Sequence, residues 1–161
     1  MGAGRIIDPI AQFMQEHDHA LSQLASLGRA VRTIEAEGLT PDAEVRIVRA
    51  LHFINEEVTV HNRGEEEALF PVLERYVEGP TQNMRADHRE LKREFVRLRR
   101  AARTLRRQKK NKKAADEFVA VSRRVMQIFV NHIHKENHIL FPLVQKFLTK
   151  DALREVARRL T

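Results

Sequence analysis

Two short stretches of this sequence carry histidine and glutamate side chains at the spacing of metal ligands. His61 is followed one helical turn later by Glu65, and His132 is followed at the same distance by Glu136. The two copies are 71 residues apart, and each continues into Leu-Phe-Pro. Because residues four apart lie on the same face of an α-helix, each pair would present its imidazole and its carboxylate side by side.

A second duplicated feature precedes each copy at the same offset. Glu16-His17 and Asp87-His88 are also 71 residues apart. The repeat is typical of one helical hairpin duplicated within the chain, and it predicts two halves related by an approximate two-fold axis. The candidate ligands fall into two sets of three, His17, His61 and Glu65 in one and His88, His132 and Glu136 in the other.

The helical phase of these residues points them inward. Each residue advances about 100° around an α-helix, which places both His-x-x-x-Glu pairs in the middle of apolar stripes. At their far ends the predicted stripes include Tyr76 in one copy and Ile139 and Phe147 in the other. A carboxylate buried among apolar side chains is costly unless its charge is neutralised. A pair of cations would neutralise two such carboxylates and the repulsion between them.

Each part of the pattern has a simpler explanation when it stands alone. A single inward histidine is more often a hydrogen-bonded core residue, and a single His-x-x-x-Glu is more often an ion pair. Two copies at the same phase, each with a further histidine one helix earlier, favour a metal site.

The other histidines fail the phase test. His134 and His138 are spaced for a metal pair but project away from the stripe that holds His132. We place them on the surface or around the site, together with His19 and His52.

Three further glutamates lie near the first copy. Glu66 and Glu67 are predicted to point outward or sideways. Glu57, one turn before His61, lies at the edge of the stripe and is predicted to be the extra polar neighbour of the site.

The elements that position these residues are predicted to be helices throughout. Proline after a capping residue marks helix starts at Asp8-Pro9 and Thr40-Pro41, and Gly38 ends the first helix. The expected helices run over about 8–38, 40–78, 81–107 and 114–148, with a loop at 108–113 and a short amphipathic helix over about 151–160. Short connections favour an all-α, up-down-up-down four-helix bundle.

Pro71 and Pro142 lie just beyond the candidate ligands. Neither has an N–H to bond the carbonyl four residues earlier, so we expect a kink or a helix end at both places.

Composition bounds the remaining possibilities. The length of 161 residues favours a single domain over 1–161, with the bundle over about 8–148. The absence of cysteine leaves histidine and carboxylate as metal ligands, which suits iron, manganese or zinc. The first eight residues lack a signal-peptide pattern, and no stretch has the length and apolarity of a membrane span. We expect a soluble, cytoplasmic protein without a membrane partner, either a monomer or a weak dimer.

The net charge of +7 is concentrated in one segment. Residues 97–113 contain no acidic side chain and ten basic ones. Such a segment could attract nucleic acid, anionic lipid or an acidic partner. We favour the alternative of an ordinary helix end, because Leu98, Ala101, Ala102 and Leu105 are spaced as a core stripe.

These motifs resemble the hemerythrin-like family, the HHE cation-binding domain, over about residues 8–148. The resemblance implies a non-haem di-iron centre inside the bundle, with an oxo or hydroxo group between two iron ions. It implies that His17 and His61 bind one iron and that His88 and His132 bind the other. Glu65 and Glu136 would bridge both.

The sequence departs from the oxygen-carrying members of that family. Those proteins have a fifth histidine one turn from the third-helix histidine and an aspartate as second bridge, whereas here Met84 and Lys92 flank His88 and the second bridge is Glu136. The site resembles instead the four-His, two-Glu branch, which includes proteins of iron-centre repair, nitric-oxide and peroxide chemistry, and iron-responsive regulation.

The resulting prediction is a di-iron redox protein that binds O2, peroxide or nitric oxide at an open iron position. If the protein is an enzyme, we expect it to be an oxidoreductase with a role in the stress response. Met14, Leu21, Phe95 and Phe129 are expected to line its dry pocket. Lys92 either donates a proton to the bound species or, as we favour, extends to solvent. The alternatives are an iron or oxygen sensor acting through the basic segment 97–113 and a reversible oxygen carrier.

Overall fold

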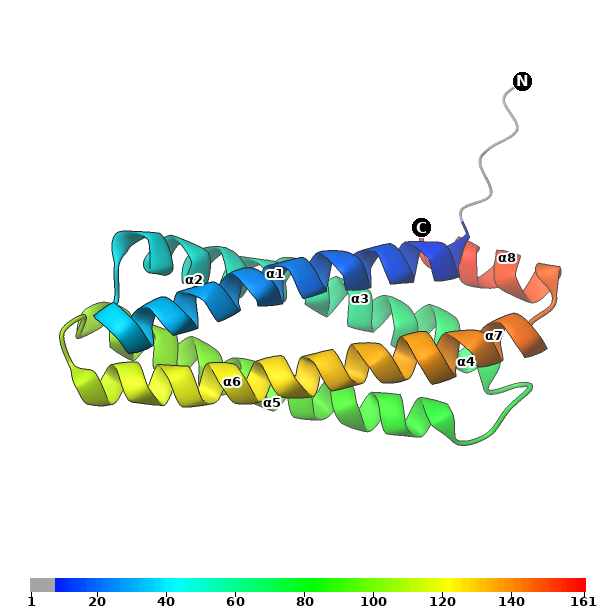
Figure 1. Ribbon diagram of the computed structural model, residues 1–161. Coiled ribbons are helices and arrows are strands. Elements are labelled where there is room, and N and C mark those ends of the chain that lie inside the picture. Colours follow the sequence, from blue (N-terminus) through cyan, green and yellow to red (C-terminus); the bar gives the residue numbers. More distant parts are fainter. Residues whose placement is uncertain (1–7) are drawn as a thin grey trace, which may run out of the picture.

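The computed structural model describes residues 8–161, and it confirms an all-α bundle of four long antiparallel helical rods (Figure 1). No strand occurs among the residues described. The first rod is α1 (Pro9–Glu37) and the third is α5 (Pro80–Arg107). The second and fourth rods are each interrupted by π-helical turns. Their segments are α2 (Pro41–Phe53), η1 (Ile54–Val58), α3 (Thr59–Gly64), η2 (Glu65–Leu69) and α4 (Phe70–Leu73) in the second, and α6 (Lys112–Lys135), η3 (Glu136–Leu140) and α7 (Phe141–Phe147) in the fourth.

A short final helix, α8 (Lys150–Arg159), closes one end of the bundle. Figure 1 shows it beside the start of α1, at the end where α4 and α7 also lie. Ala152 and Val156 are its buried residues. None of the helices described combines the length and apolarity that crossing a membrane requires. The absence of a signal peptide was predicted from residues that include 1–7, which lie outside those described.

Local capping explains where the rods begin. The side chains of Asp8, Thr40 and Asn111 each accept hydrogen bonds from backbone N–H groups in the first turn of α1, α2 and α6. The fourth rod therefore starts at Lys112, two residues earlier than predicted, because Asn111 caps it. The second rod ends at Leu73 and not near Glu78, and a turn over 74–76 follows. Gly79, with φ of 110°, ends the connection to α5 in a conformation that favours glycine.

The core is divided into two apolar clusters, with the candidate ligands between them along every rod. In α1, Phe13 belongs to one cluster and Ala20 to the other, and His17 lies between. In α5, Met84 and Leu91 flank His88 in the same way. The six polar side chains therefore occupy a polar layer enclosed by hydrophobic packing on both sides.

The break in regular helix predicted at Pro71 and Pro142 is present, but the chain remains helical. A π-helical turn precedes each proline, and in each turn an N–H bonds the carbonyl five residues earlier, Phe70 to Glu65 and Phe141 to Glu136. This wider turn accommodates a residue that cannot donate to the α-helical ladder.

The π turns also explain where the phase prediction was wrong. Tyr76, Ile139 and Phe147, placed in the inner stripes, are 44%, 51% and 38% exposed. Each lies within or beyond a π turn. The extra residue in that turn shifts the following side chains around the helix axis from the positions that a constant 100° per residue would give them. Met14 is also exposed, because the buried face of α1 is narrow and centred on Phe13 and His17.

Candidate metal centre

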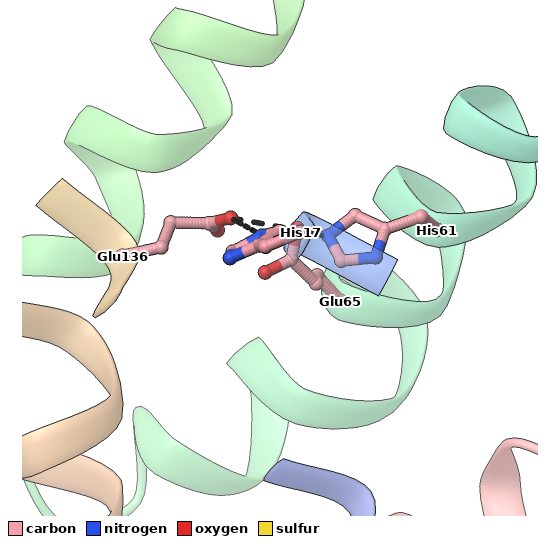
Figure 2. Close-up of side chains that lie close together, drawn as sticks. All are labelled: His17, His61, Glu65 and Glu136. Carbon is pink, nitrogen blue, oxygen red and sulfur yellow. Dashed lines mark hydrogen bonds and ion pairs between the residues drawn. The ribbon is translucent and has the colours of Figure 1, made fainter. Parts of the chain in front are cut away.

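The six predicted ligands converge in the polar layer from all four rods. The histidines come from α1, α3, α5 and α6, and the glutamates are the first residues of η2 and η3. All six are buried, and both glutamates have no exposed surface. Ligand atoms within 4.8 Å of one another form two overlapping groups, His17, His61, Glu65 and Glu136, and Glu65, His88, His132 and Glu136. Figure 2 shows the first group, with the side chains pointing toward one another.

Each glutamate makes its shortest contacts with one histidine from each half of the chain. Glu65 Oε1 lies 3.0 Å from Nε2 of His61 and 3.4 Å from Nε2 of His88. Glu136 Oε1 lies 3.2 Å from Nε2 of His132 and 3.0 Å from Nε2 of His17. Both carboxylates therefore lie between the two histidine pairs, where a bridging ligand would have to be.

Within each pair the two imidazoles face each other through Nε2. The Nε2–Nε2 distance is 3.1 Å for His17 and His61 and also 3.1 Å for His88 and His132. Two neutral imidazoles that present lone pairs to each other at this distance repel, and a shared cation or a proton removes the repulsion. The same geometry recurs in both halves, as the duplication predicts.

Outer partners orient the rings. Nδ1 of His17 lies 2.7 Å from Oδ1 of Asn137, and Nδ1 of His88 lies 2.9 Å from Oε1 of Glu66. When Nδ1–H donates to these oxygens, Nε2 is left free to face the centre.

The other two histidines have acidic partners on the preceding rod. Nδ1 of His132 lies 3.0 Å from Asp87 Oδ2 and can donate to it. Nδ1 of His61 lies 3.5 Å from Glu16 Oε2, an ion-pair distance, and makes no hydrogen bond within the part of the chain described. The acidic residue before each of His17 and His88 thus supports the histidine of the neighbouring rod.

Two of these partners differ from the sequence predictions. Glu66 was expected to point outward or sideways and was not identified as a partner of His88, and Asn137 was not identified at all. Glu57, predicted to be the extra polar neighbour of the site, is exposed, lies 3.8 Å from His19 and lines a pocket that also includes His61. One signal was available in the sequence, because Glu66 and Asn137 are themselves 71 residues apart and each follows a candidate ligand.

The two central carboxylates lack hydrogen bonds. All four oxygens of Glu65 and Glu136 are buried without a hydrogen-bond partner among residues 8–161, and only the ion-pair contacts with the histidines offset their charge. Buried charge of this kind is costly unless it is paired or coordinates a metal. Two carboxylates and four imidazoles directed at one centre are a donor set suited to iron, manganese or zinc. The residues present fit a metal site on these grounds.

The raised pKa values of two histidines show that the carboxylates give the centre a strongly negative potential. Burial disfavours a charged His132, but the carboxylates of Glu136, Glu65 and Asp87 outweigh it and raise its pKa to about 9. Burial likewise opposes protonation of His61, and neighbouring glutamates raise its pKa well above the usual value. Burial raises the pKa of Glu136, but its contacts with Glu65 and with three histidines hold that pKa well below the usual value. The centre therefore attracts positive charge.

A pocket of about 250 Å³ leads to the centre, and His17, His61 and His132 lie in its wall. Ala20, Val58 and Phe129 contribute apolar surface to it. Phe129 was correctly expected to line a pocket at the site, whereas Met14 and Leu21 do not line this one. Phe95 and the exposed Lys92 line a separate cleft of about 480 Å³ that includes His88 and Glu66.

The remaining polar features lie on the surface. His19, His52, His134 and His138 are exposed, and the rings of His134 and His138 stack with centroids 5.6 Å apart. In the basic segment, the predicted core stripe is buried at Leu98, Ala101, Ala102 and Leu105, and the arginines lie on the outer face of α5. The four lysines are exposed in the connection after α5 and at the start of α6. This arrangement is that of an ordinary amphipathic helix, the alternative favoured from the sequence over a segment that binds nucleic acid.

Comparison with models of known families yields a match. The model of the family described as the hemerythrin HHE cation binding domain matches residues 8–144, which include all six candidate ligands and their four outer partners. No curated protein matches the chain.

Proposed function

The chain belongs to the hemerythrin HHE cation-binding family, and we propose that it is a non-haem di-iron protein that binds and reacts with O2, hydrogen peroxide or nitric oxide. One observation carries the proposal. The buried carboxylates of Glu65 and Glu136, which lack hydrogen bonds, each lie between a histidine of one half and a histidine of the other. That arrangement is suited to two metal ions that share both carboxylates.

The proposed ligand assignment follows the histidine pairs. His17 and His61 would hold one iron, His88 and His132 the other, and Glu65 and Glu136 would bridge them. Iron bound there would supply one-electron redox chemistry and an open coordination position for the small molecule.

The side chains around the centre would control access and protons. Ala20, Val58 and Phe129 give the pocket beside His17 and His61 an apolar lining, which favours small uncharged molecules over hydrated ions. Glu16 and Glu57 also line the pocket and would disfavour anions. Hydrogen-bonded outer partners keep the Nδ1 protons of His17, His88 and His132 away from the centre and the Nε2 lone pairs directed toward it. Glu16 faces Nδ1 of His61 at an ion-pair distance.

The absence of a fifth nitrogen ligand favours reaction over reversible carriage. Met84, one turn before His88, is buried in the apolar cluster, and Lys92, one turn after it, is exposed. With two histidines for each metal, more positions are open to exogenous ligands. We therefore place peroxide or nitric-oxide chemistry ahead of oxygen storage.

Metal analysis and optical spectra of protein from iron-supplied cells test the proposal. The expected result is two iron ions per chain with the charge-transfer absorption of a bridged ferric pair. The absorption and at least one of the two iron ions should be lost in His61→Ala and in Glu136→Ala. His134→Ala, at an exposed histidine, is the matched control and should retain both. A wild type that binds no iron, or variants that retain two, would refute the site.

Reaction assays then separate the activities. Rapid peroxide consumption or a nitrosyl spectrum on anaerobic addition of nitric oxide would support the proposed chemistry. A stable oxygenated spectrum that reverses under vacuum would support the carrier instead.

A further inference from the structure

The 71-residue repeat extends beyond the ligands to the residues that support them. Glu16 and Asp87 are equivalent positions, and they face the equivalent histidines His61 and His132. Glu66 and Asn137 are likewise equivalent, and they face His88 and His17. The outer partners can therefore be compared position by position, as if each half were a variant of the other.

The first difference between the halves is a charge. His88 donates to the carboxylate of Glu66 at 2.9 Å, whereas His17 donates to the neutral amide oxygen of Asn137 at 2.7 Å. A carboxylate acceptor makes the imidazole a stronger donor to a metal than an amide acceptor does, because it offsets the positive charge that the ring gains on coordination.

The second difference also strengthens metal binding by the His88/His132 pair. His132 makes a 3.0 Å hydrogen bond to Asp87, which Lys135 also contacts and fixes in place. His61 has only an ion-pair contact at 3.5 Å with the more exposed Glu16. Both histidines of the His88/His132 pair therefore donate to carboxylates, and neither histidine of the other pair does.

The structure explains why Glu16 has no lysine partner. The position equivalent to Lys135 is Gly64, and a Cβ atom placed there would lie 3.0 Å from Cδ2 of Leu160, just beyond α8. Because the C-terminal segment packs directly on Gly64, any side chain there would have to displace Leu160. The asymmetry around the centre is thus tied to the short helix that the duplication does not include.

We infer that the two metal positions are unequal, and that the His88/His132 position binds its metal first and more tightly. The His17/His61 position, whose histidines lack a hydrogen bond to a carboxylate, is the weaker and therefore the more readily exchanged one. This inference rests on the proposed function, since it requires both positions to bind metal. Loss of one outer partner typically changes metal affinity 10- to 100-fold, which sets the expected size of the difference.

Zinc alone is the probe, because it has no redox chemistry. Crystals of the metal-free protein are soaked or grown with one equivalent of Zn²⁺, and the occupancy of each position is measured by anomalous scattering. We expect the zinc occupancy of the His88/His132 position to be at least about ten times that of the His17/His61 position. The test measures where the first zinc ion binds and not only how tightly each ion binds. Repulsion between two cations would weaken binding of the second ion even if the two positions were identical. Equal occupancy would overturn the inference.

Exchanging the two outer partners is the second test. In the double variant Glu66→Asn/Asn137→Glu, the occupancy ratio at one equivalent should shift by at least about tenfold toward the His17/His61 position. Glu67→Asn, at an exposed neighbour, is the control and should leave the ratio unchanged. The ratio compares two positions in one molecule, so a general loss of stability does not alter it. An unchanged ratio in the double variant would refute the role of Glu66 and Asn137.

The outcomes also separate this inference from the proposed function. Zinc bound equally at both positions would refute the inequality and leave the two-metal centre intact. Wild type that binds no zinc and no iron would refute both.

Discussion

Glu136 Oε1 lies 3.0 Å from Nε2 of His17, so a residue of the last rod contacts a residue of the first across the middle of the bundle. The contact joins the two halves of the duplicated chain, and Glu65 makes the reciprocal contact with His88 at 3.4 Å. The polar layer therefore includes contacts that join the two halves. Substituting one of its side chains should affect either one metal position or both, depending on the residue.

That difference predicts unequal losses of metal. His17→Ala removes a ligand from one position only, so we expect it to retain about one metal ion per chain after dialysis. Glu136→Ala removes a carboxylate that contacts both pairs, and we expect less than one. Elemental analysis of both variants measures this. Equal metal content in the two variants would contradict the assignment of Glu136 as a shared ligand.

The metal-free protein should lose stability as pH rises from 6.5 to 9. The pKa of His132 is about 9 in the folded chain against 6.5 for the free group, so the stabilising proton is fully present below pH 6.5 and is lost as pH passes 9. The shift corresponds to a loss on the order of 3 kcal/mol in the free energy of unfolding. Urea unfolding of metal-free protein at pH 6 and pH 9.5 measures it. The zinc-loaded protein should show a smaller change, because metal replaces the proton; a metal-free protein of constant stability would contradict this electrostatic account.

Metal removal should destabilise the chain at neutral pH. Free metal at about one hundred times its dissociation constant stabilises the folded state by about 2.7 kcal/mol for each site that the unfolded chain lacks. We expect chelation to lower the unfolding midpoint in urea and addition of Zn²⁺ to restore it. His61→Ala, which retains the His88/His132 position, should respond to both treatments by about half as much.

Filling the pocket should slow access without removing metal. Ala20 lines the pocket, and its equivalent in the other half is the fully buried Leu91. We expect Ala20→Leu to lower the rate of nitric oxide binding to the iron-loaded protein by an order of magnitude or more, measured by stopped flow. Ala25→Leu, at an exposed position of the same helix, is the control. Unchanged rates in Ala20→Leu would show that ligands enter elsewhere.

Much of the fold and the six candidate ligands follow from local signals. Capping residues and prolines mark the starts of α1 and α2, and the repeat identifies the ligand pairs with no knowledge of the tertiary structure. The exposure of Ile139 and Tyr76 could not be predicted in this way, because a constant helical period conceals the extra residue of a π turn. The contact between Glu66 and His88 was also missed, since helical phase describes one rod and not what the next rod brings to it.

The π turns have a consequence for local dynamics. Glu65 and Glu136 each begin a turn whose hydrogen bonds close a wider, less favourable ring than those of an α-helix. In the absence of metal, these five-residue segments should open more often than the α-helices on either side, and their amide hydrogens should exchange with solvent faster. Because the glutamates at their starts are the proposed shared ligands, metal binding should slow exchange most at 65–69 and 136–140. Local opening of the backbone would then be the step by which metal enters and leaves.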